Sequence, residues 1–558
     1  MLVCEYLTSR LKREGVKVVF GYTGGNIVYC IDAVQRADGI DFIENRHEED
    51  SAFAANGVAA QTGHIACAMV SSGPGALNLV TGIANAWYDS LPVLFIAGDV
   101  SRYQGKTLAR QDAFQATPIV RAAAPFCKFA AEIRSLDGIE QIFDRAFSEL
   151  TNGRHGPVLL SIAHFIQRSS WPSGPPAIDP AGFDPCQTKP GIASADLSEI
   201  SRILFCSKAP LVLIGGGMKA DAETLDLLLK RCSIPFAVSL RGASFLDQKL
   251  PTFLGLVGDY GHKAANAALA ACDCLIALGT RLDERQTWAL KKYNPTCRII
   301  HLDIDPDELF EQSDTYYPVH AAGSELFGLL EKHDWNAGVF SAWKTKLDRL
   351  RSFFPRIPSG HPLHELISRI GSLMPEKTSF FVDVGMNQML SAQSLELHAG
   401  QRFFTSSGLG SMGFAIPAAA GASAAIRAEG KKELVVAITG DGGFQMSFND
   451  LITVRKEHLP LKILVINNSC LGMIRGLQDH IMEGRLTASV DGYSVCDIEK
   501  IASAFDIRYH RVDLLSADPR SLQDILLDPG SPALFEIRCA YEDSIPYPNG
   551  PCDLEQPD

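Results

Sequence analysis

The stretch LVVAITGDGGF, residues 434–444, joins an apolar run to a turn of glycine and aspartate. The run at 434–439 predicts a strand buried on both faces of a parallel sheet, and residues 461–466 predict another. A helical pattern at 448–458 lies between them. Asp441 follows the first strand, and Asn467 and Asn468 follow the second. Because ligands bind outside the carboxyl ends of parallel strands, we expect a doubly wound α/β fold with a ligand site here.

The residue types at these strand ends suit a site for a metal ion and a phosphate. Carboxylate, carboxamide and backbone carbonyl oxygens are hard donors, which Mg²⁺ prefers together with phosphate oxygens. Gly440 and Gly442 have no side chain to keep a diphosphate away from the backbone. An ordinary acidic turn followed by an Asn-rich turn is the alternative. We therefore expect Mg²⁺ at Asp441 and Asn468.

Further motifs accompany this one along the chain. Acidic residues in IENRHEED, residues 43–50, precede a small-residue helix predicted at 52–60. The other motifs are FGYTGGN at 20–26, SSGPGALNL at 71–79, DSLPV at 89–93, QDAFQ at 111–115, SGLGSMG at 407–413 and LGM at 471–473. Together they resemble the acetolactate synthase-like group of thiamine diphosphate (ThDP)-dependent enzymes. The resemblance runs from residue 1 to about residue 540.

The resemblance implies three α/β domains, each with a doubly wound parallel sheet. They are a pyrimidine-binding domain at 1–170, a middle domain at 190–340 and a diphosphate-binding domain at 355–545. A Pro/Gly/Ser-rich segment at 169–191 fits a linker between the first two. In this family the cofactor lies between the first domain of one subunit and the third domain of another. The resemblance therefore implies a homodimer at least, with active sites across its interface.

The resemblance also assigns roles to single residues. Glu48, which follows a His as in the family, would exchange a proton with the aminopyrimidine ring, although Glu44, Glu49 and Asp50 are equally acidic. Met412 would support the bent cofactor; core filling is the alternative. Gln115 and Lys128 are the other catalytic candidates, and Asp441, Asn468 and the Cys470 carbonyl are the metal ligands. The implied cofactor-binding residues are Gly24, Gly25, Glu48, Ser72, Asn78, Val384, Gly385, Met386, Asn387, Gly410, Met412, Gly440, Asp441, Gly442, Gly443, Asn468, Cys470, Leu471, Gly472 and Met473.

A possible FAD site lies in the middle domain, because acetolactate synthases carry a structural flavin there. One departure leaves a flavin-free domain open: Val319-His320-Ala321-Ala322 stands where the family often has Gly-Asp. The residues that match flavin contacts are Arg154, Gly215, Gly216, Gly217, Gly279, Arg281, Asp283 and Arg285.

The expected activity is decarboxylation of a 2-oxo acid, with pyruvate as the default, followed by carboligation to an acceptor carbonyl. Phe114, Met473 and Leu477 match positions around the substrate. Leu477 replaces a Trp that favours 2-ketobutyrate, so the acceptor stays open. A non-ligating decarboxylase is the main alternative, but such enzymes generally use an adjacent His pair, which this chain lacks. A catalytically silent binding or regulatory homologue is a further alternative, although Glu48 and Asp441 are both present.

Composition agrees with a globular enzyme. Of 558 residues, 21% are charged and 46% apolar. The net charge of −13, without a long basic run, argues against nucleic acid and anionic membranes as partners. No apolar run reaches the ~20 residues of a spanning helix, and the first residues do not form a secretory signal. Fourteen scattered cysteines without a Cys-x-x-Cys pair favour a reducing compartment, the cytoplasm.

Overall fold

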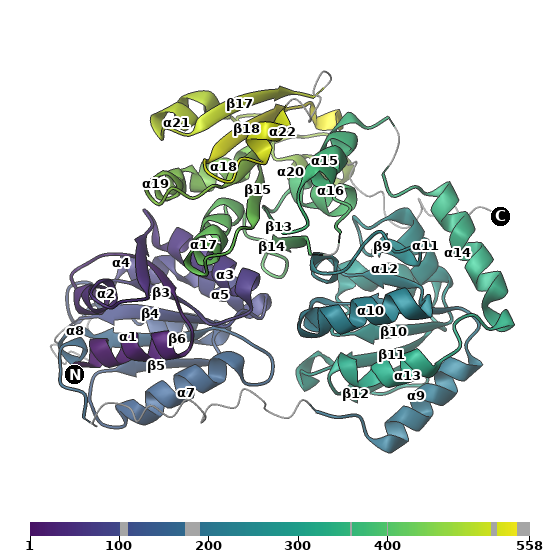
Figure 1. Ribbon diagram of the computed structural model, residues 1–558, viewed down its shortest axis with the longest axis horizontal. Helices are drawn as coiled ribbons and strands as arrows, with labels where there is room; N and C mark the ends of the chain where they lie inside the picture. The colour runs from purple at the N-terminus through teal and green to yellow at the C-terminus, as the bar shows by residue number, and fades with distance from the viewer. Residues whose placement is uncertain (101–109, 173–189, 358–359, 399, 515–521, 544–558) are drawn as a thin grey trace.

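The computed structural model describes residues 1–100, 110–172, 190–357, 360–398, 400–514 and 522–543. Three six-stranded sheets, parallel throughout, form three domains, as expected. In Figure 1 the first domain (purple to blue) and the middle domain (teal) lie side by side, and the third domain (green to yellow) lies above both. Most of the predicted linker, residues 173–189, lies outside the described residues.

The first sheet has the strand order β2-β1-β3-β4-β6-β5. Its strands are β1 (Val18–Tyr22), β2 (Asp41–Glu44), β3 (Ala66–Val70), β4 (Val93–Asp99), β5 (Phe129–Ile133) and β6 (Val158–Ala163). Its helices are α1 (Val3–Arg13), α2 (Val28–Gln35), α3 (Glu48–Thr62), α4 (Pro74–Asn78), α5 (Val80–Tyr88), α6 (Ile119–Ala123), α7 (Ile139–Thr151) and α8 (His164–Gln167). Successive residues of β1 enter different cores: Phe20 packs with α3, whereas Val19 packs with α1 on the other face.

The middle sheet has the order β12-β11-β10-β7-β8-β9. Its strands are β7 (Pro210–Ile214), β8 (Phe236–Val238), β9 (Phe253–Leu256), β10 (Cys274–Leu278), β11 (Arg298–Asp303) and β12 (Tyr316–His320). Its helices are α9 (Ser194–Cys206), α10 (Ala222–Cys232), α11 (Lys263–Ala271), α12 (Glu284–Tyr293), α13 (Phe327–Lys332) and α14 (Ser341–Phe353). Two separate apolar cores, one on each face, hold this sheet between its helices.

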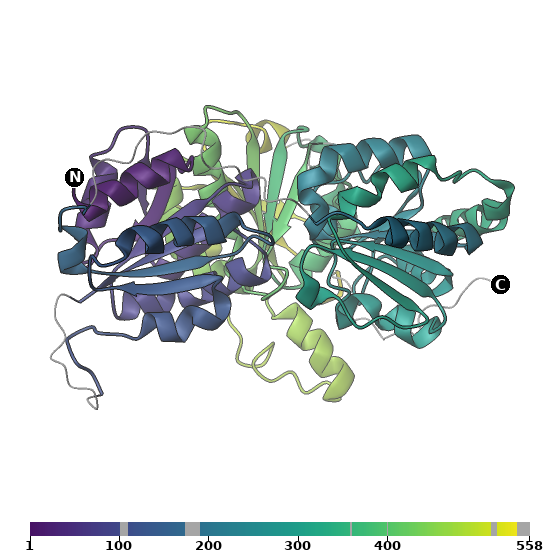
Figure 2. The ribbon, with the colours of Figure 1, turned by 90° about the horizontal axis from the view of Figure 1, so that it is seen from below.

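The third sheet has the order β14-β13-β15-β16-β18-β17. Its strands are β13 (Thr378–Val382), β14 (Arg402–Thr405), β15 (Leu434–Gly440), β16 (Lys462–Asn467), β17 (Arg508–Asp513) and β18 (Ala533–Arg538). Its helices are α15 (Pro362–Leu373), α16 (Met386–Ser394), α17 (Ala415–Ala428), α18 (Asp441–Ser447), α19 (Leu451–Lys456), α20 (Gly472–Ile481), α21 (Ile498–Ala504) and α22 (Gln523–Leu526). Helix α20 projects from the body in Figure 2. The single helix predicted at 448–458 is wrong: a 3-10 turn, Phe448–Asp450, precedes the shorter α19.

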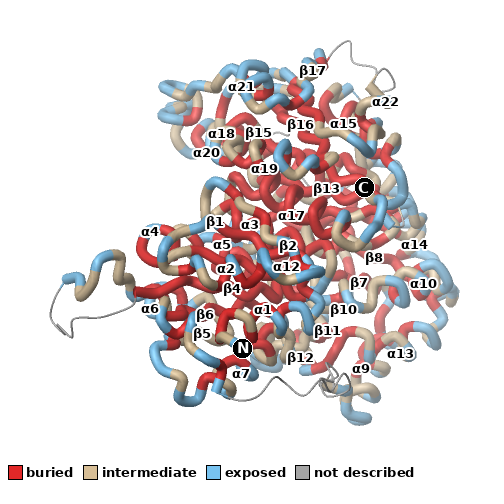
Figure 3. Tube along the Cα trace, turned by 60° about the vertical axis from the view of Figure 1, so that its left-hand side comes forward, coloured by how far each residue is buried: buried red, intermediate tan, exposed pale blue. Residues whose placement is uncertain are grey.

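Helices α3 and α17 form a layer shared by the first and third domains. One apolar core contains residues of both helices and of both sheets. Figure 3 shows buried residues continuing through both helices. The helices approach closely because Gly57 faces Ala418 and Gly421 faces Ala54. In the described part of the chain, no helix is long and apolar enough to cross a membrane.

Candidate active site

Asp441 lies at the carboxyl edge of the third sheet, where it was expected. Strands β15 and β16 pair with Gly440 opposite Ile466, which brings the residue after each strand to the same edge. The Asp441 carboxylate accepts hydrogen bonds from the Ser469 N–H at 2.7 Å and from the Tyr493 hydroxyl at 2.9 Å. Burial raises the pKa of Asp441, and these hydrogen bonds oppose that rise. The Asn468 side chain accepts from the Cys470 N–H at 3.2 Å in the same turn.

Four loops of the third domain meet around the glycines of residues 440–443. A Cβ on Gly442 would stand 2.9 Å from Leu471 Cδ2 and 3.0 Å from Met412 Cε. A Cβ on Gly472 would stand 2.7 Å from Met386 Cγ and 3.0 Å from Asn468 Nδ2. The structure therefore brings these predicted cofactor-binding loops together, with side chains packed closely against Gly442 and Gly472.

Asp383 is a buried carboxylate beneath these loops that the sequence reasoning missed. It accepts hydrogen bonds from the Val384 N–H at 2.9 Å, the Gly413 N–H at 3.1 Å and the Thr439 hydroxyl at 3.0 Å. Burial raises its pKa to about 6. Asp383 follows β13 as Asp441 follows β15, so an acid at a strand end was the available signal. Asp383 also contacts one of the predicted cofactor-binding residues, Asn387. The Asn387 side chain donates a hydrogen bond to the Asp383 backbone carbonyl at 2.7 Å.

Glu48 opens helix α3 in the first domain. Its Oε2 accepts a hydrogen bond from Asn78 Nδ2 at 2.9 Å. A Cβ on Gly75 would stand 3.0 Å from Glu48 Oε1, so the glycine leaves space beside this oxygen. His47 caps the helix by accepting from the Glu49 N–H. The half-buried carboxyl therefore has one oxygen fixed by Asn78 and one oxygen without a hydrogen-bond donor among the described residues.

The loops next to Glu48 gather other predicted residues. Ser72 accepts a hydrogen bond from the Asn26 side chain at 2.6 Å, a partner that the sequence did not reveal. A Cβ on Gly24 would stand 2.6 Å from Ser71 Cβ, which explains the glycine in the TGGN motif. Gly25 follows it in the same turn, with open space around it. These contacts hold the loops after β1 and β3 together.

Gln115 and Lys128 lie in different surroundings. Gln115 packs against Gly73, whose Cβ would be 3.1 Å from Gln115 Cβ. Its neighbour Phe114 is 84% exposed. The Lys128 ammonium instead donates to the Asn152 carbonyl, and burial lowers its pKa. The hydrogen bonds and ion pairs of the described chain do not join Lys128 to Glu48 or Gln115.

The two groups of candidate residues lie on different elements of the chain. Among the described residues, no hydrogen bond or ion pair joins Glu48 or Asn78 to Asp441, Asn468 or Cys470. The first group lies at the start of α3, and the second lies at the carboxyl edge of β15 and β16. The two groups, here called half-sites, have no direct polar contact with each other among the described residues.

The second group contains a donor set that fits a magnesium ion. Nowhere in the described ranges do three His, Cys, Asp or Glu side chains gather into a metal-binding cluster. Asp441 supplies one carboxylate, and Asn468 and the Cys470 carbonyl supply neutral oxygens in the turn beside it. Mg²⁺ binds through one or two carboxylates plus phosphate oxygens, so this donor set suits it with a diphosphate.

The residues matched to flavin contacts are engaged within the protein. Arg154 donates to Asp305 at 3.0 Å and to Ser90 at 2.8 Å, and it pairs with Glu308. A Cβ on Gly215 would overlap the Gly279 carbonyl oxygen, so close packing of two loops already requires that glycine. Gly217 donates to the same carbonyl at 3.0 Å.

The remaining flavin candidates follow β10. Asp283 caps α12 by accepting from the Arg285 N–H at 2.9 Å. Arg285 lies 3.5 Å from Asp259, and Arg281 lies in the preceding loop. These contacts do not test FAD binding, which stays a prediction.

Comparison with known proteins covers all three domains. Models of the thiamine pyrophosphate enzymes match in order: the N-terminal TPP binding domain at residues 1–120, the central domain at 197–326 and the C-terminal TPP binding domain at 383–537. The large subunit of acetolactate synthase isozyme 2 from Escherichia coli is 32% identical over 96% of this chain and 94% of its own length. Acetolactate synthase 1, chloroplastic, from Oryza sativa is 32% identical over 97% of this chain and 85% of its own length.

Fold and site thus define a ThDP-dependent enzyme with three α/β domains. An acetolactate synthase from Mycobacterium bovis, 34% identical over 88% of this chain and 81% of its own length, agrees with that class. The chain belongs to the thiamine pyrophosphate enzyme family, in its acetolactate synthase-like group.

Proposed function

We propose that this protein is a carboligase that releases CO₂ from a 2-oxo acid, with pyruvate as the default donor. It then joins the remaining fragment to an acceptor carbonyl. The observation that carries the proposal is the meeting of Asp441, Gly442, Met412 and Leu471 at one sheet edge. These are the residues that the resemblance assigns to the cofactor, and relatives matching nearly the whole chain are named acetolactate synthases.

Each half-site contributes separate chemistry. When bound, ThDP supplies the nucleophilic carbon and the electron sink that loss of CO₂ requires. Asp441 and Asn468, with the Cys470 carbonyl, would hold the Mg²⁺ that neutralises its diphosphate. Glu48 would hold and pass a proton at Oε1, while Asn78 keeps Oε2 and the carboxyl plane in place. Met412, which lies over Gly442, would support the cofactor from below.

The walls beside this site favour carbon–carbon bond formation over protonation. Met386 packs on Gly472 and Leu471 packs on Gly442, and both side chains are apolar. Met473 and Leu477 lie four residues apart on α20 and therefore on the same face of that helix. We expect these apolar side chains to limit the access of water, which would leave time for a second carbonyl compound to arrive.

A second copy of the chain would complete the site. The described contacts leave Glu48 and Asp441 unconnected within one chain. Exposed apolar side chains flank both half-sites: Leu77 is next to Asn78, Met446 is on α18 and Ile474 is on α20. Such residues are typical of a surface that another subunit covers. We therefore propose that Glu48 of one subunit and Asp441 of the other serve one cofactor.

Co-expression of two inactive variants tests this arrangement. Glu48→Gln and Asp441→Ala should each be nearly inactive alone. A mixed dimer would contain one site with both defects and one site with none, so random assembly should recover about a quarter of normal activity. Sites formed within single chains would each keep one defect, and no activity would return. Recovery near zero, with mixed dimers verified by tag pull-down, would contradict the proposal.

Metal and cofactor binding provide the direct test of the proposed chemistry. Titration calorimetry with ThDP and Mg²⁺ should show binding by the unmodified protein and none by Asp441→Ala. The unmodified protein should also release CO₂ from pyruvate only when both are added. Unchanged ThDP affinity in Asp441→Ala would remove the metal assignment. CO₂ release without added ThDP, after the cofactor has been stripped, would remove the cofactor assignment.

Two finer points belong to the same proposal. FAD in the middle domain would make the purified protein yellow, whereas the flavin-free alternative predicts a colourless protein with the same activity. We propose the cytoplasm or an equivalent reducing compartment as its location, supported by the cysteines. The twelve described cysteines are all free thiols.

A further inference from the structure

We propose that Asp89 and Arg241 are positioning residues for residues 406–413, here called the cofactor loop. This loop contains Gly410 and Met412 and joins β14 to α17. The inference rests on the proposed function, because the loop matters for catalysis only if it holds the cofactor. It adds a second requirement: the middle domain, through Arg241, helps to fix the shape of a loop in the third domain.

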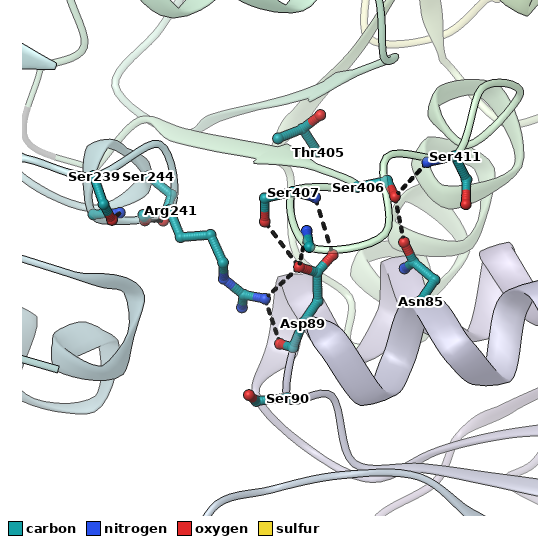
Figure 4. Close-up of polar contacts among 12 residues, drawn as sticks. Asn85, Asp89, Ser90, Ser239, Arg241, Ser244, Thr405, Ser406, Ser407 and Ser411 are labelled. Carbon is teal, nitrogen blue, oxygen red and sulfur yellow. Dashed lines mark hydrogen bonds and ion pairs between the residues drawn. The ribbon is translucent and has the colours of Figure 1, made fainter. Parts of the chain in front are cut away.

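Asp89 joins the first domain to the cofactor loop through the loop backbone (Figure 4). It follows α5 and is only 3% exposed. Its Oδ1 accepts hydrogen bonds from the Ser407 hydroxyl at 2.8 Å and the Gly408 N–H at 3.1 Å. Its Oδ2 accepts from the Ser407 N–H at 3.3 Å. Because two of these donors are backbone amides, Asp89 fixes the path of the chain and not only one side chain.

Arg241 brings the middle domain to the same carboxylate. Its guanidinium lies 2.9 Å from Asp89 Oδ1 and also donates to the Asp89 carbonyl oxygen. The side chain approaches Gly216 closely, since a Cβ there would stand 2.8 Å from Arg241 Cβ and 3.0 Å from Nε. Gly216 was a candidate for flavin contact, and here it makes room for Arg241. A buried carboxylate is costly without a cation, so Arg241 stabilises the charge that holds the loop.

Further hydrogen bonds fix the backbone of the cofactor loop on both sides of Met412. Ser406 donates its hydroxyl to the Asn85 side chain and accepts the Ser411 N–H at 2.9 Å. At the far end, the Gly413 N–H donates to Asp383 at 3.1 Å. Met412 lies between these two anchors, and its side chain covers Gly442, where a Cβ would stand 3.0 Å from Met412 Cε. A loop released at Ser407 and Gly408 would keep its Asp383 anchor but lose the fixed approach of Met412.

An asparagine at residue 89 cannot replace the carboxylate in this geometry. One of its two head-group atoms would be an N–H donor facing the Ser407 amide or Arg241, both of which are donors themselves. Asp89→Asn therefore keeps the size of the side chain but removes its negative charge and one of its two acceptor oxygens. Arg241→Gln removes the cation while keeping a long polar side chain, so it should have the same effect in weaker form.

Hydrogen exchange of the cofactor-free protein provides the first readout. In Asp89→Asn, a peptide that covers residues 406–413 should exchange at least about tenfold faster than in the unmodified protein, because the Ser407 or the Gly408 amide loses its acceptor and the loop loses its contact with a charged group. Arg241→Gln should show a smaller acceleration in the same peptide, and Arg241→Lys should restore part of the protection. This readout needs no cofactor. If the unmodified protein fails to bind ThDP, the proposed function fails while the exchange result still stands.

ThDP affinity and steady-state kinetics provide the second readout. We expect Asp89→Asn to weaken ThDP binding about tenfold or more, the scale of one charge-assisted hydrogen bond, and to lower kcat with little change in KM for pyruvate. The matched control is Arg402→Gln. Arg402 is 33% exposed against 34% for Arg241 and also joins two domains, through the Gln61 carbonyl and Glu433, but it does not touch the loop. The control should leave loop exchange and ThDP affinity unchanged.

Two results would overturn the proposal. Unchanged exchange at 406–413 in both Asp89→Asn and Arg241→Gln would show that the loop keeps its shape without them. An equal loss of ThDP affinity in Arg402→Gln would show that general domain packing, and not the contacts of Asp89 with Arg241 and the cofactor loop, supports the cofactor. If Asp89→Asn does not fold, Arg241→Gln and Ser407→Ala provide the test instead. The first removes only the contacts of the Arg241 guanidinium with Asp89, and the second removes only the hydrogen bond from the Ser407 hydroxyl.

Discussion

Gly57 of α3 lies so close to Ala418 of α17 that a Cβ on Gly57 would overlap the Ala418 carbonyl oxygen. The reciprocal contact, Gly421 against Ala54, is equally tight. The first and third domains can share one core only because neither helix has a side chain at these positions. The packing that supports both half-sites therefore depends on two glycines within helices.

We expect Gly57→Ala to destabilise the protein by more than about 3 kcal/mol, because backbone must move to admit the methyl group. Gly328→Ala in α13 is the control. No atom lies within 4 Å of a Cβ there, so this helical substitution should be neutral or slightly stabilising. Urea unfolding measures both. A Gly57→Ala protein as stable as the unmodified one would mean that α3 and α17 are not packed as described.

Asp50 should make stability depend on pH at the same interface. Its carboxyl is buried beside Asp450 on the third domain and accepts from Asn449 at 2.6 Å. Burial, followed by the nearby Asp450, Glu49 and Glu48 charges, raises the pKa of Asp50. Burial also raises the pKa of Asp450, despite hydrogen bonds from Thr453 and Asn45.

A raised carboxyl pKa means that the folded state binds more protons than the unfolded state above the ordinary carboxyl pKa of about 4. Stability should therefore fall as pH rises from that value towards the folded pKa. Asp50→Asn removes the charge and keeps an acceptor for Asn449. We expect it to be more stable than the unmodified protein at pH 8 by at least about 1 kcal/mol, with a smaller gain at pH 5. A difference that does not vary with pH would contradict this assignment.

Glu48→Gln should separate cofactor binding from cofactor activation. The amide keeps the size of the side chain but cannot exchange a proton at Oε1. We expect turnover to fall at least about 10²-fold, the usual scale for a positioned proton-transfer group, while ThDP affinity stays within a few-fold. Steady-state rates and titration calorimetry measure the two effects. Near-normal turnover would show that Glu48 is not the group that exchanges the proton.

Leu477→Trp should narrow the range of acceptors. Leu477 is half-buried on α20, on the same face as Met473, where a larger ring would occupy acceptor space. CO₂ release from the donor should be largely unchanged, because the donor reacts before the acceptor arrives. Competition between small and bulky acceptor aldehydes, followed by mass spectrometry, measures the change. An unchanged acceptor range would place Leu477 outside the acceptor pocket.

Local sequence pattern was enough to predict the sheets. The predicted strands at 434–439 and 461–466 agree with β15 and β16 to within one residue at each end, because short apolar runs between turns mark buried parallel strands. The strand predicted at 461–466 lies instead at Lys462–Asn467. Asn467 joins β16 because it pairs with Arg538, and pairing register across a sheet is not encoded in the local run.

Contacts between distant segments could not be predicted in this way. The helix predicted at 448–458 is interrupted because Asn449 and Asp450 bond to Asp50 and Asn45 in the first domain. The Tyr493 hydrogen bond to Asp441 joins residues 52 positions apart, and no spacing motif announces it. The DSLPV motif supported the family resemblance, but the role of its Asp89 appears only when the three domains are placed together.

The central claim is that this enzyme forms a carbon–carbon bond after it releases CO₂. Mass spectrometry of products, after incubation with labelled pyruvate, ThDP, Mg²⁺ and a panel of acceptor aldehydes and ketones, tests it most directly. We predict acetolactate from pyruvate alone, or a ligated product with at least one acceptor, in excess over free acetaldehyde. Acetaldehyde as the main product at saturating concentration of every acceptor would contradict the account and establish a simple decarboxylase instead.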